Sequence, residues 1–290
     1  MLPLFTFILG TVIGSFLNVC ILRWPQDQSV VRPRSHCPNC GNFIKAYDNI
    51  PILSYLILRG RCRACQTPIS PLYPIVELLT GLFFLACGLR FGYTPETVKY
   101  LVLGSGLIVL IFSDIKFRLL PNQITVYGTF VGLIVSLKVL IDDDSLQSLI
   151  SLNQRAEMLL QWVARSWAGS WPGNYFASTS FYSLLASLGG ALFGGGILFL
   201  MGELYYLIRK EEGIGMGDIK MMGMVGAFLG LKLTFVTIML GSLLGSILGV
   251  IGMLFFGKDL KYQLPFGTFL GIAAMILALL GKPILQLLFP

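Results

Sequence analysis

The sequence contains little charge for its length. Of its 290 residues only 12% are Asp, Glu, Lys or Arg, whereas 55% are hydrophobic, and the mean hydropathy is +0.79. A soluble domain carries about twice that charged fraction. This shortage excludes an ordinary soluble domain and indicates an all-α polytopic membrane protein.

Histidine is almost absent as well. His36 is the only one, so Ser–His or Cys–His catalysis would have to depend on it, and a histidine-rich metal site is excluded. No G-x-G-x-x-G motif follows an expected strand, so the sequence carries no signature of a dinucleotide site. Carboxylates are therefore the best-placed groups for hydrolytic chemistry in this chain.

The sequence contains several long apolar stretches. Roughly 20 apolar residues cross the hydrocarbon core of a bilayer. Eight stretches are candidates: 3–22, 73–90, 97–113, 121–141, 179–208, 218–231, 233–256 and 264–288. We expect about eight transmembrane helices. The chain would then consist of a first transmembrane helix at 1–22, a polar loop domain at 23–72 and a membrane domain at 73–290.

Two segments of this plan need a separate interpretation. The apolar residues 1–22 have no basic residue ahead of them and no small-residue cleavage site, so we expect a retained span rather than a signal peptide. Residues 142–178 are polar and rich in tryptophan. They form an external insertion, which is either a helix along the outer surface or a plain spacer.

Basic residues indicate the orientation of the chain. Of the 21 lysines and arginines, fourteen lie in the loops after the first, third, fifth and seventh spans, and seven lie on the other side. Because basic residues gather in cytoplasmic loops, we expect the loop at 23–72 in the cytoplasm and both termini outside. The same bias accounts for the net charge of +7, which is therefore no sign of nucleic-acid binding.

Two aspartates stand at the ends of apolar stretches. Asp114 closes the third span, and Asp218 opens the sixth within the glycine-rich segment 213–220. A charge at the bilayer centre costs about 2.5–3.5 kcal/mol, so acids at such positions need a reason. The chain between them crosses the membrane twice, which predicts that both acids lie on the same, cytoplasmic face.

A pair of carboxylates on one face can perform hydrolysis. Two such groups held close together cannot both ionise easily, so one keeps its proton. The charged one can take a proton from water while the protonated one polarises a peptide carbonyl. Two alternatives remain open from the residues alone. Asp218 can cap its helix and Asp114 can pair with Lys116 and Arg118, or the two acids can serve a transporter as an ion relay.

Four of the six cysteines form two C-x2-C pairs. Cys37 and Cys40 are separated by twenty-one residues from Cys62 and Cys65, a spacing close to that of a four-thiolate zinc site. A bound zinc would fold this small loop domain, which has too little apolar content for a core of its own. The alternatives are two redox pairs or two disulfides, although a cytoplasmic location argues against stable disulfides.

The remaining candidates for zinc ligands are interpreted more simply. His36 is adjacent to Cys37, but four thiolates already complete a zinc site, so we interpret it as a bystander. Cys20 and Cys87 fall inside spans and are expected to behave as small apolar residues.

Taken together, these residues resemble the bacterial type IV prepilin peptidases (leader peptidase/N-methyltransferase). Asp114, followed by Leu120-Pro121, is similar to the first catalytic aspartate of that family, and Gly215-Met-Gly-Asp218 to the G-x-G-D motif around the second. The other matching segments are GSFLNVC at 14–20, RWP at 23–25, CPNCG at 37–41, YDNIPILSYLILRGRCRAC at 47–65, PIS at 68–70, YPIVELLTG at 73–81 and PFG at 265–267.

The resemblance implies an intramembrane aspartic endopeptidase in the bacterial inner membrane, with Asp114 and Asp218 as its catalytic pair. Its substrates would be type IV prepilins or pseudopilins, cleaved after the glycine that ends a basic leader. The family then methylates the new N-terminal residue with S-adenosylmethionine, an activity it associates with the zinc loop. The residues that would bind this donor, the oligomeric state and the particular pilin are not indicated by the sequence.

Some features depart from this resemblance or lie outside it. Asn122 stands where the family often has an aspartate, and the insertion at 142–178 is longer than the family leads us to expect. Glu77 and Glu203 are further acids within apolar stretches and weak candidates for a role; Glu77 can instead satisfy buried backbone groups or pair with a cation. A scaffold for pilus assembly without catalysis is a third possible function, after the peptidase and the transporter.

Overall fold

The computed structural model describes residues 2–137, 139, 174–211, 213–256 and 265–288. Their regular structure is helical, and the only pairing of extended chain among them is two isolated bridges in the cysteine loop. Most of the predicted insertion at 142–178 lies outside the described residues; its last five residues belong to a helix. The chain divides into two compact units, Met1–Pro121 and Asn122–Pro290.

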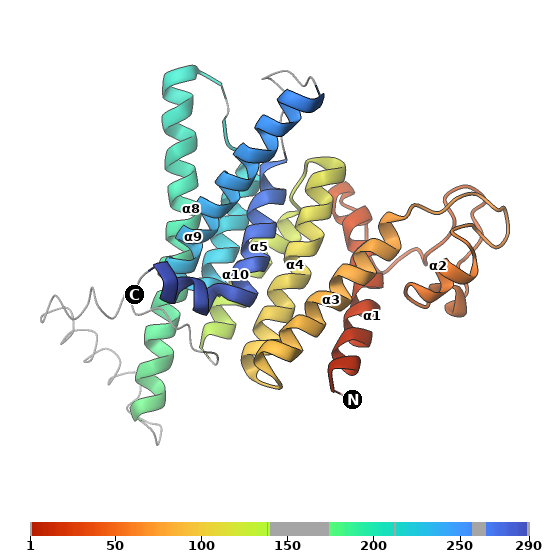
Figure 1. Cartoon of the computed structure of the whole chain (residues 1–290), viewed down its shortest axis with the longest axis horizontal. Helices are drawn as coiled ribbons and strands as arrows, with labels where there is room; N and C mark the ends of the chain where they lie inside the picture. The colour runs from red at the N-terminus through yellow and green to blue at the C-terminus, as the bar shows by residue number, and fades with distance from the viewer. Residues whose placement is uncertain (1, 138, 140–173, 212, 257–264, 289–290) are drawn as a thin grey trace, which may run out of the picture. The chain divides into compact units, whose positions relative to one another are not determined.

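The first unit contains three long helices and the cysteine loop (Figure 1). Its elements are α1 (Leu2–Arg23), η1 (Trp24–Gln26), η2 (Ala46–Asn49), α2 (Leu53–Ile57), α3 (Leu72–Phe91) and α4 (Pro95–Phe117). The second unit contains α5 (Asn122–Ser136), α8 (Asn174–Arg209), α9 (Met216–Phe256) and α10 (Phe266–Leu288).

Small residues hold α1 against α3 in an antiparallel arrangement. A Cβ atom at Gly10 would lie 2.8 Å from the Cα of Gly81, and one at Gly14 would lie 2.8 Å from the Cα of Glu77. One turn farther on, the Asn18 side-chain amide donates to the carbonyl of Tyr73 at 3.1 Å. Such close backbone approach is typical of helix pairs in lipid, where no hydrophobic drive brings helices together.

Local signals at both ends define α4. Thr94 is its N-cap and accepts a hydrogen bond from the backbone N–H of Thr97, while Pro95 and Glu96 occupy its first turn. The helix ends where Arg118 takes a left-handed conformation and donates its N–H to the Asp114 carbonyl at 2.9 Å. Asp114 therefore lies in the last turn of α4.

A reversal at Gly230 divides α9 into two segments. Gly230 has a φ of 78°, in the region that glycine adopts most readily. A Cβ atom at Gly194 of α8 would contact both the Met222 carbonyl and the side chain of Thr234. Residues twelve apart in a straight helix are separated by about 18 Å, so the chain must turn back between them.

In the described part of the chain, six helices are long and apolar enough to cross a membrane: α1, α3, α4, α8, α9 and α10. This count takes α9 as one helix, although the reversal separates the two predicted stretches 218–231 and 233–256 at the expected place. The remaining predicted span, 121–141, coincides with α5, whose 15 residues are fewer than a full crossing requires. Within the described residues, each of the eight apolar stretches thus coincides largely with a helix, which confirms the predicted all-helical class of fold.

Glycines also set the packing of the second unit. Gly190 of α8 and Gly226 of α9 approach so closely that a Cβ on either would meet the other's backbone carbonyl. Gly241 and Gly245 of α9 face Leu270 and Phe269 of α10. These four glycines therefore let the helices of the second unit pack closely. The predicted division at 1–22, 23–72 and 73–290 stays a prediction.

Candidate functional site

Asp114 and Asp218 belong to different units of the chain. Asp114 lies in the last turn of α4 and is buried, with only 7% of its surface exposed. It follows a run of buried apolar residues that includes Leu110 and Ile111. The sequence therefore places a carboxylate where an apolar helix reaches its end, as predicted.

Asp218 lies in the first turn of α9 and is half-buried. Its backbone N–H donates to the carbonyl of Gly215 at 3.0 Å. A Cβ atom at Gly215 would lie 3.4 Å from the Asp218 Oδ2 atom, so Gly215 lies next to the carboxylate. The helix dipole at an N-terminus also favours a negative charge there.

Lys220 joins the start of α9 to the start of α5, a contact that the sequence analysis missed. Its Nζ atom donates to the Asn122 Oδ1 atom at 2.9 Å, across 98 residues of chain. Asn122 is the position at which the resemblance leads one to expect an aspartate. Because the side-chain oxygen of Asn122 accepts the hydrogen bond from Lys220, an aspartate at this position is not required for the contact.

The structure brings the four cysteines of the loop together. The Sγ atoms of Cys37, Cys40, Cys62 and Cys65 all lie within 4.8 Å of one another, and those of Cys37 and Cys65 are 3.7 Å apart. Sulfur atoms on a tetrahedron with zinc–sulfur bonds of about 2.3 Å would be about 3.8 Å apart. The cluster therefore fits one metal ion with four thiolate ligands.

Each cysteine pair lies on the same kind of turn. The Cys37 N–H donates to the Asn42 carbonyl and the Cys62 N–H to the Thr67 carbonyl, both at 2.9 Å. The chain returns through left-handed residues at equivalent positions, Gly41 with φ 71° and Gln66 with φ 55°. Two such turns facing each other present two sulfur atoms each to a common centre.

Hydrogen bonds at the cluster favour the charged form of some of its thiols. The hydroxyl and backbone N–H of Thr67, followed by the Asn39 amide, lower the pKa of Cys65 to about 5. The backbone N–H groups of Cys40 and Asn39 lower the pKa of Cys37. Thiolates are the form that binds a metal.

His36 is not part of this cluster. Its ring Nδ1 atom lies 3.0 Å from the Arg34 carbonyl, and the residue is exposed. The four-residue metal group found among the described residues consists of cysteines only, as the sequence predicts. Cys20 and Cys87 are buried within α1 and α3.

Glu77 and Glu203 have different surroundings. Glu77 is buried in α3, where its Oε2 atom accepts from the backbone N–H of Ile52 at 2.7 Å, and the Ser15 side chain also bonds to it. Glu203 is exposed on α8. The backbone partner that the sequence allowed for Glu77 is thus Ile52, which lies 25 residues away in the loop and is not identified by any local pattern.

Two family models match most of the chain. Residues 8–91 match the bacterial peptidase A24 N-terminal domain, and residues 101–250 match the type IV leader peptidase family. The first match contains all four clustered cysteines, and the second contains both aspartates.

Several known proteins are similar over most of this chain, and each is named a prepilin leader peptidase/N-methyltransferase. The one from Myxococcus xanthus is 37% identical over 254 residues, which are 88% of this chain and 64% of that protein. The one from Pseudomonas aeruginosa is 32% identical in an alignment 302 positions long, which covers 96% of this chain and 90% of that protein. The one from Neisseria gonorrhoeae is 31% identical, with 84% of this chain and 80% of that protein covered.

The chain thus spans just under two thirds of the Myxococcus protein and nine tenths of the Pseudomonas protein. No solved structure matches it.

Proposed function

Because this chain belongs to the type IV prepilin leader peptidase/N-methyltransferase family (peptidase A24), we propose that it is an intramembrane aspartic endopeptidase. It removes the basic leader of type IV prepilins or pseudopilins after a glycine. It then methylates the new N-terminal residue. Asp114 and Asp218 are the catalytic pair, and the active site opens at the cytoplasmic face of the bacterial inner membrane.

The observation that carries this proposal is the position of the two acids at helix ends. Asp114 is in the last turn of α4 and Asp218 in the first turn of α9. The sequence predicts two spans between them, at 121–141 and 179–208, and the described helices α5 and α8 fall on these stretches. Two crossings return the chain to the face it left, which supports a common face for both acids.

The contact between Lys220 and Asn122 adds support from covalent geometry. Asn122 follows Asp114 by eight residues, of which the first three are still helical. Their Cα atoms are therefore at most about 22 Å apart in any arrangement. Lys220, two residues after Asp218, bonds to Asn122. The short segment from Asp114 to Asn122 therefore limits how far Asp114 can lie from the start of α9, where Asp218 is located. This limit supports the proposal that the two carboxylates act together.

In the proposed reaction the charged carboxylate takes a proton from water as the water oxygen attacks the peptide carbonyl carbon. The protonated carboxyl donates its proton to the carbonyl oxygen. Collapse of the tetrahedral intermediate breaks the C–N bond, and a proton passes to the leaving amine. Because the two groups titrate as a pair, neither role is assigned to one aspartate.

We further propose that Cys37, Cys40, Cys62 and Cys65 hold one structural Zn²⁺. A bound zinc would crosslink the two turns of the loop. The donor for methylation is S-adenosylmethionine, which supplies the methyl group when bound. The basic residues of the loop support its cytoplasmic location, the side on which a basic leader also remains.

Mass spectrometry of a co-expressed prepilin's N-terminus tests the peptidase. Asp114→Asn and Asp218→Asn should each abolish leader removal, because each leaves one ionisable carboxyl without its partner. Glu96→Gln is the matched control, since Glu96 lies in the first turn of α4, at the opposite end from Asp114. Normal processing by either aspartate variant would refute the catalytic pair.

A further inference from the structure

The loop between α1 and α3 carries a row of exposed apolar side chains. Ile50, Leu53, Leu56 and Ile57 are 45%, 53%, 64% and 67% exposed. Leu53, Leu56 and Ile57 have the i, i+3, i+4 spacing that places side chains on one face of a helix, here α2, and Ile50 precedes Leu53 by three residues. We call these four residues the α2 stripe. Contiguous exposed apolar side chains mark an interaction site.

The opposite side of α2 is held by the loop itself. The Tyr55 hydroxyl donates to the Ile69 carbonyl at 3.4 Å. Gly60 leaves room for this ring, because a Cβ atom there would lie 2.9 Å from the Tyr55 hydroxyl oxygen. Since Tyr55 faces the loop, the α2 stripe faces outward.

Glu77 fixes the position of the start of α2 along α3. The N–H of Ile52, the residue before α2, bonds to the Glu77 carboxylate. Glu77 follows Leu72, the first residue of α3, by five residues, or about 7.5 Å along the helix. A 20-residue helix is about as long as the hydrocarbon core is thick. The start of α2 is therefore held level with the interior of α3 rather than above its end.

Figure 1 shows the same relation within this unit. The loop projects sideways from α1 and α3, and α2 lies level with the length of these helices rather than beyond the end of α1. Amphipathic helices at a membrane surface bury their apolar face about 5–10 Å into the boundary between headgroups and acyl chains. The distance of about 7.5 Å along α3 from Leu72 to Glu77 falls in that range.

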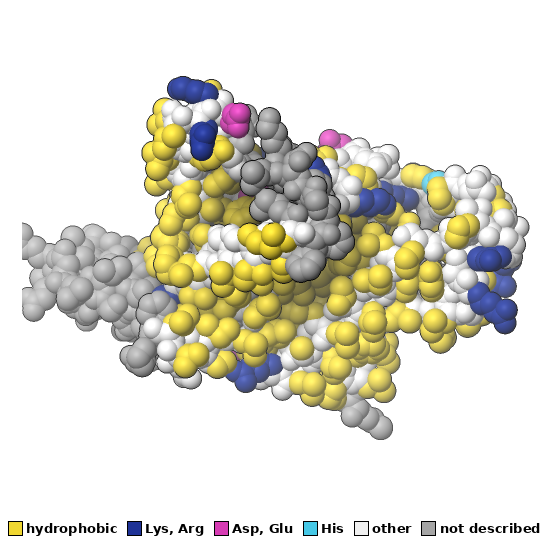
Figure 2. Space-filling model, turned by 45° about the horizontal axis from the view of Figure 1, so that its top comes forward, with side chains coloured by type: hydrophobic (Ala, Val, Ile, Leu, Met, Phe, Trp, Pro, Cys, Tyr) yellow, Lys and Arg dark blue, Asp and Glu magenta, His cyan; other side chains and the backbone are white. Residues whose placement is uncertain are grey.

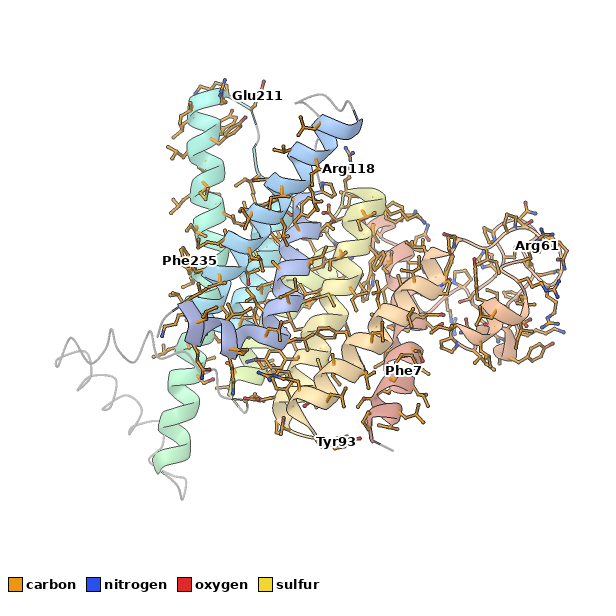
Figure 3. The ribbon with its side chains drawn as sticks, viewed as in Figure 1. Phe7, Arg61, Tyr93, Arg118, Glu211 and Phe235 are labelled. Atoms are coloured by element: carbon orange, nitrogen blue, oxygen red, sulfur yellow. The ribbon has the colours of Figure 1, made fainter. Side chains whose placement is uncertain are left out.

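The charge of the loop fits an anionic surface. Residues 23–72 contain seven arginines and lysines but only two aspartates. One of the two, Asp48, is paired with Arg63 at 2.6 Å, whereas Arg59 and Arg61, just after α2, are exposed. Figure 2 shows Lys and Arg side chains gathered at the outer end of the loop beside hydrophobic ones, and Figure 3 shows Arg61 on its outer side.

From this geometry we propose that the α2 stripe inserts into the interface of an anionic bilayer beside α3, with Arg59 and Arg61 among the lipid headgroups. Basic residues next to an inserted apolar face are attracted to anionic lipid. The same charges would repel a basic leader peptide, which favours lipid over the substrate as the occupant. The proposal requires only that α3 spans the bilayer and does not depend on the peptidase activity.

Fluorescence quenching in nanodiscs tests the proposal on the full chain. An environment-sensitive fluorescent amino acid is incorporated genetically at Leu56 or, as a control, at Val31, which is 77% exposed in the same loop but outside the stripe. Lipids brominated on their acyl chains should quench the label at 56 several-fold more than the label at 31. Quenching at 56 should increase when phosphatidylglycerol replaces part of the phosphatidylcholine.

Two sets of variants separate the apolar and the charged contributions. Leu53→Ser with Ile57→Ser should reduce quenching of the label at 56, and Arg59→Gln with Arg61→Gln should remove its dependence on phosphatidylglycerol. Metal bound by the loop shows that each variant remains folded. The comparison of the labels at positions 56 and 31 is made in the natural protein and does not depend on either set of variants.

Equal quenching at 56 and 31, or none at 56, would overturn the proposal. Shielding at 56 that begins only when a prepilin peptide is added would assign the stripe to a polypeptide and overturn it as well. Leader cleavage measured on the same samples tests the proposed peptidase activity and has no bearing on the insertion of the α2 stripe.

Discussion

Glu77 lies in the second turn of α3 and accepts the backbone N–H of Ile52 at 2.7 Å. Ile52 has a φ of 61°, a conformation that β-branched residues rarely adopt and that costs about 1–3 kcal/mol. A hydrogen bond to a charged group contributes about 1.5–3 kcal/mol, enough to offset this strain. One buried carboxylate thus fixes both the backbone before α2 and the position of the loop on α3.

Replacing Glu77 tests this role at the scale of one residue. Glu77→Ala removes the acceptor, so we expect the loop to open roughly ten- to a hundredfold more often, in line with a loss of about 1.5–3 kcal/mol. Trypsin cleavage at Arg59 and Arg61 in native membranes measures this opening. Glu77→Gln keeps an oxygen acceptor and should behave closer to the natural protein; equal cleavage of all three would contradict the role.

At the scale of elements, α8 and α9 pack through their backbones. Gly190 and Gly226 face each other, and a Cβ atom at Gly190 would also lie 2.9 Å from the Cα of Gly230. Backbone atoms cannot move aside as a flexible side chain can. The packing of these helices, and with it the reversal that follows Asp218, therefore requires glycine at the contact.

Alanine substitutions at two glycines of the same helix pair should differ in their effect on stability. Gly226→Ala forces a methyl group onto the Gly190 carbonyl and should destabilise the protein by about 1–3 kcal/mol, as overpacking does. At Gly196 nothing lies within 4 Å of an added Cβ, so Gly196→Ala should be neutral or slightly stabilising. Thermal unfolding in detergent measures both, and similar melting temperatures would contradict this packing.

At the scale of the whole molecule, the polar loop and the membrane helices depend on different forces. Apolar side chains such as Leu107, Leu110 and Phe84 form the buried part of the helical units. In the loop, the apolar residues of the α2 stripe are exposed, and the two cysteine turns meet at their sulfur atoms. A metal that crosslinks these turns would thus stabilise the loop without a hydrophobic core.

Metal analysis of the purified chain tests this difference. We expect about one zinc per chain, and Cys62→Ser should lose it because three thiolates leave the site open. Cys87→Ala is the control, since Cys87 is buried in α3 and should leave the metal in place. Full zinc occupancy in the Cys62 variant would show that the ligands are assigned wrongly.

Features that depend on neighbouring residues were predictable from the sequence. Apolar length located the helices, Gly230 fell at the expected break in α9, and the C-x2-C spacing predicted the thiol cluster that the structure contains. The roles of Asp114 and Asp218 stay a prediction, because they lie in separate units. The G-x-G-D motif and the order of the spans nevertheless indicated both residues.

What the sequence determined by itself is therefore local: which segments enter the membrane, which acids stand at their ends, and which cysteines can share a metal. These follow from hydropathy and from the short reach of a turn. Only the tertiary structure decided that Glu77 holds Ile52, that Lys220 bonds to Asn122 and that the α2 stripe faces outward. These contacts join residues 25 to 98 positions apart, and such distances in space are set by helix packing, which no local pattern encodes.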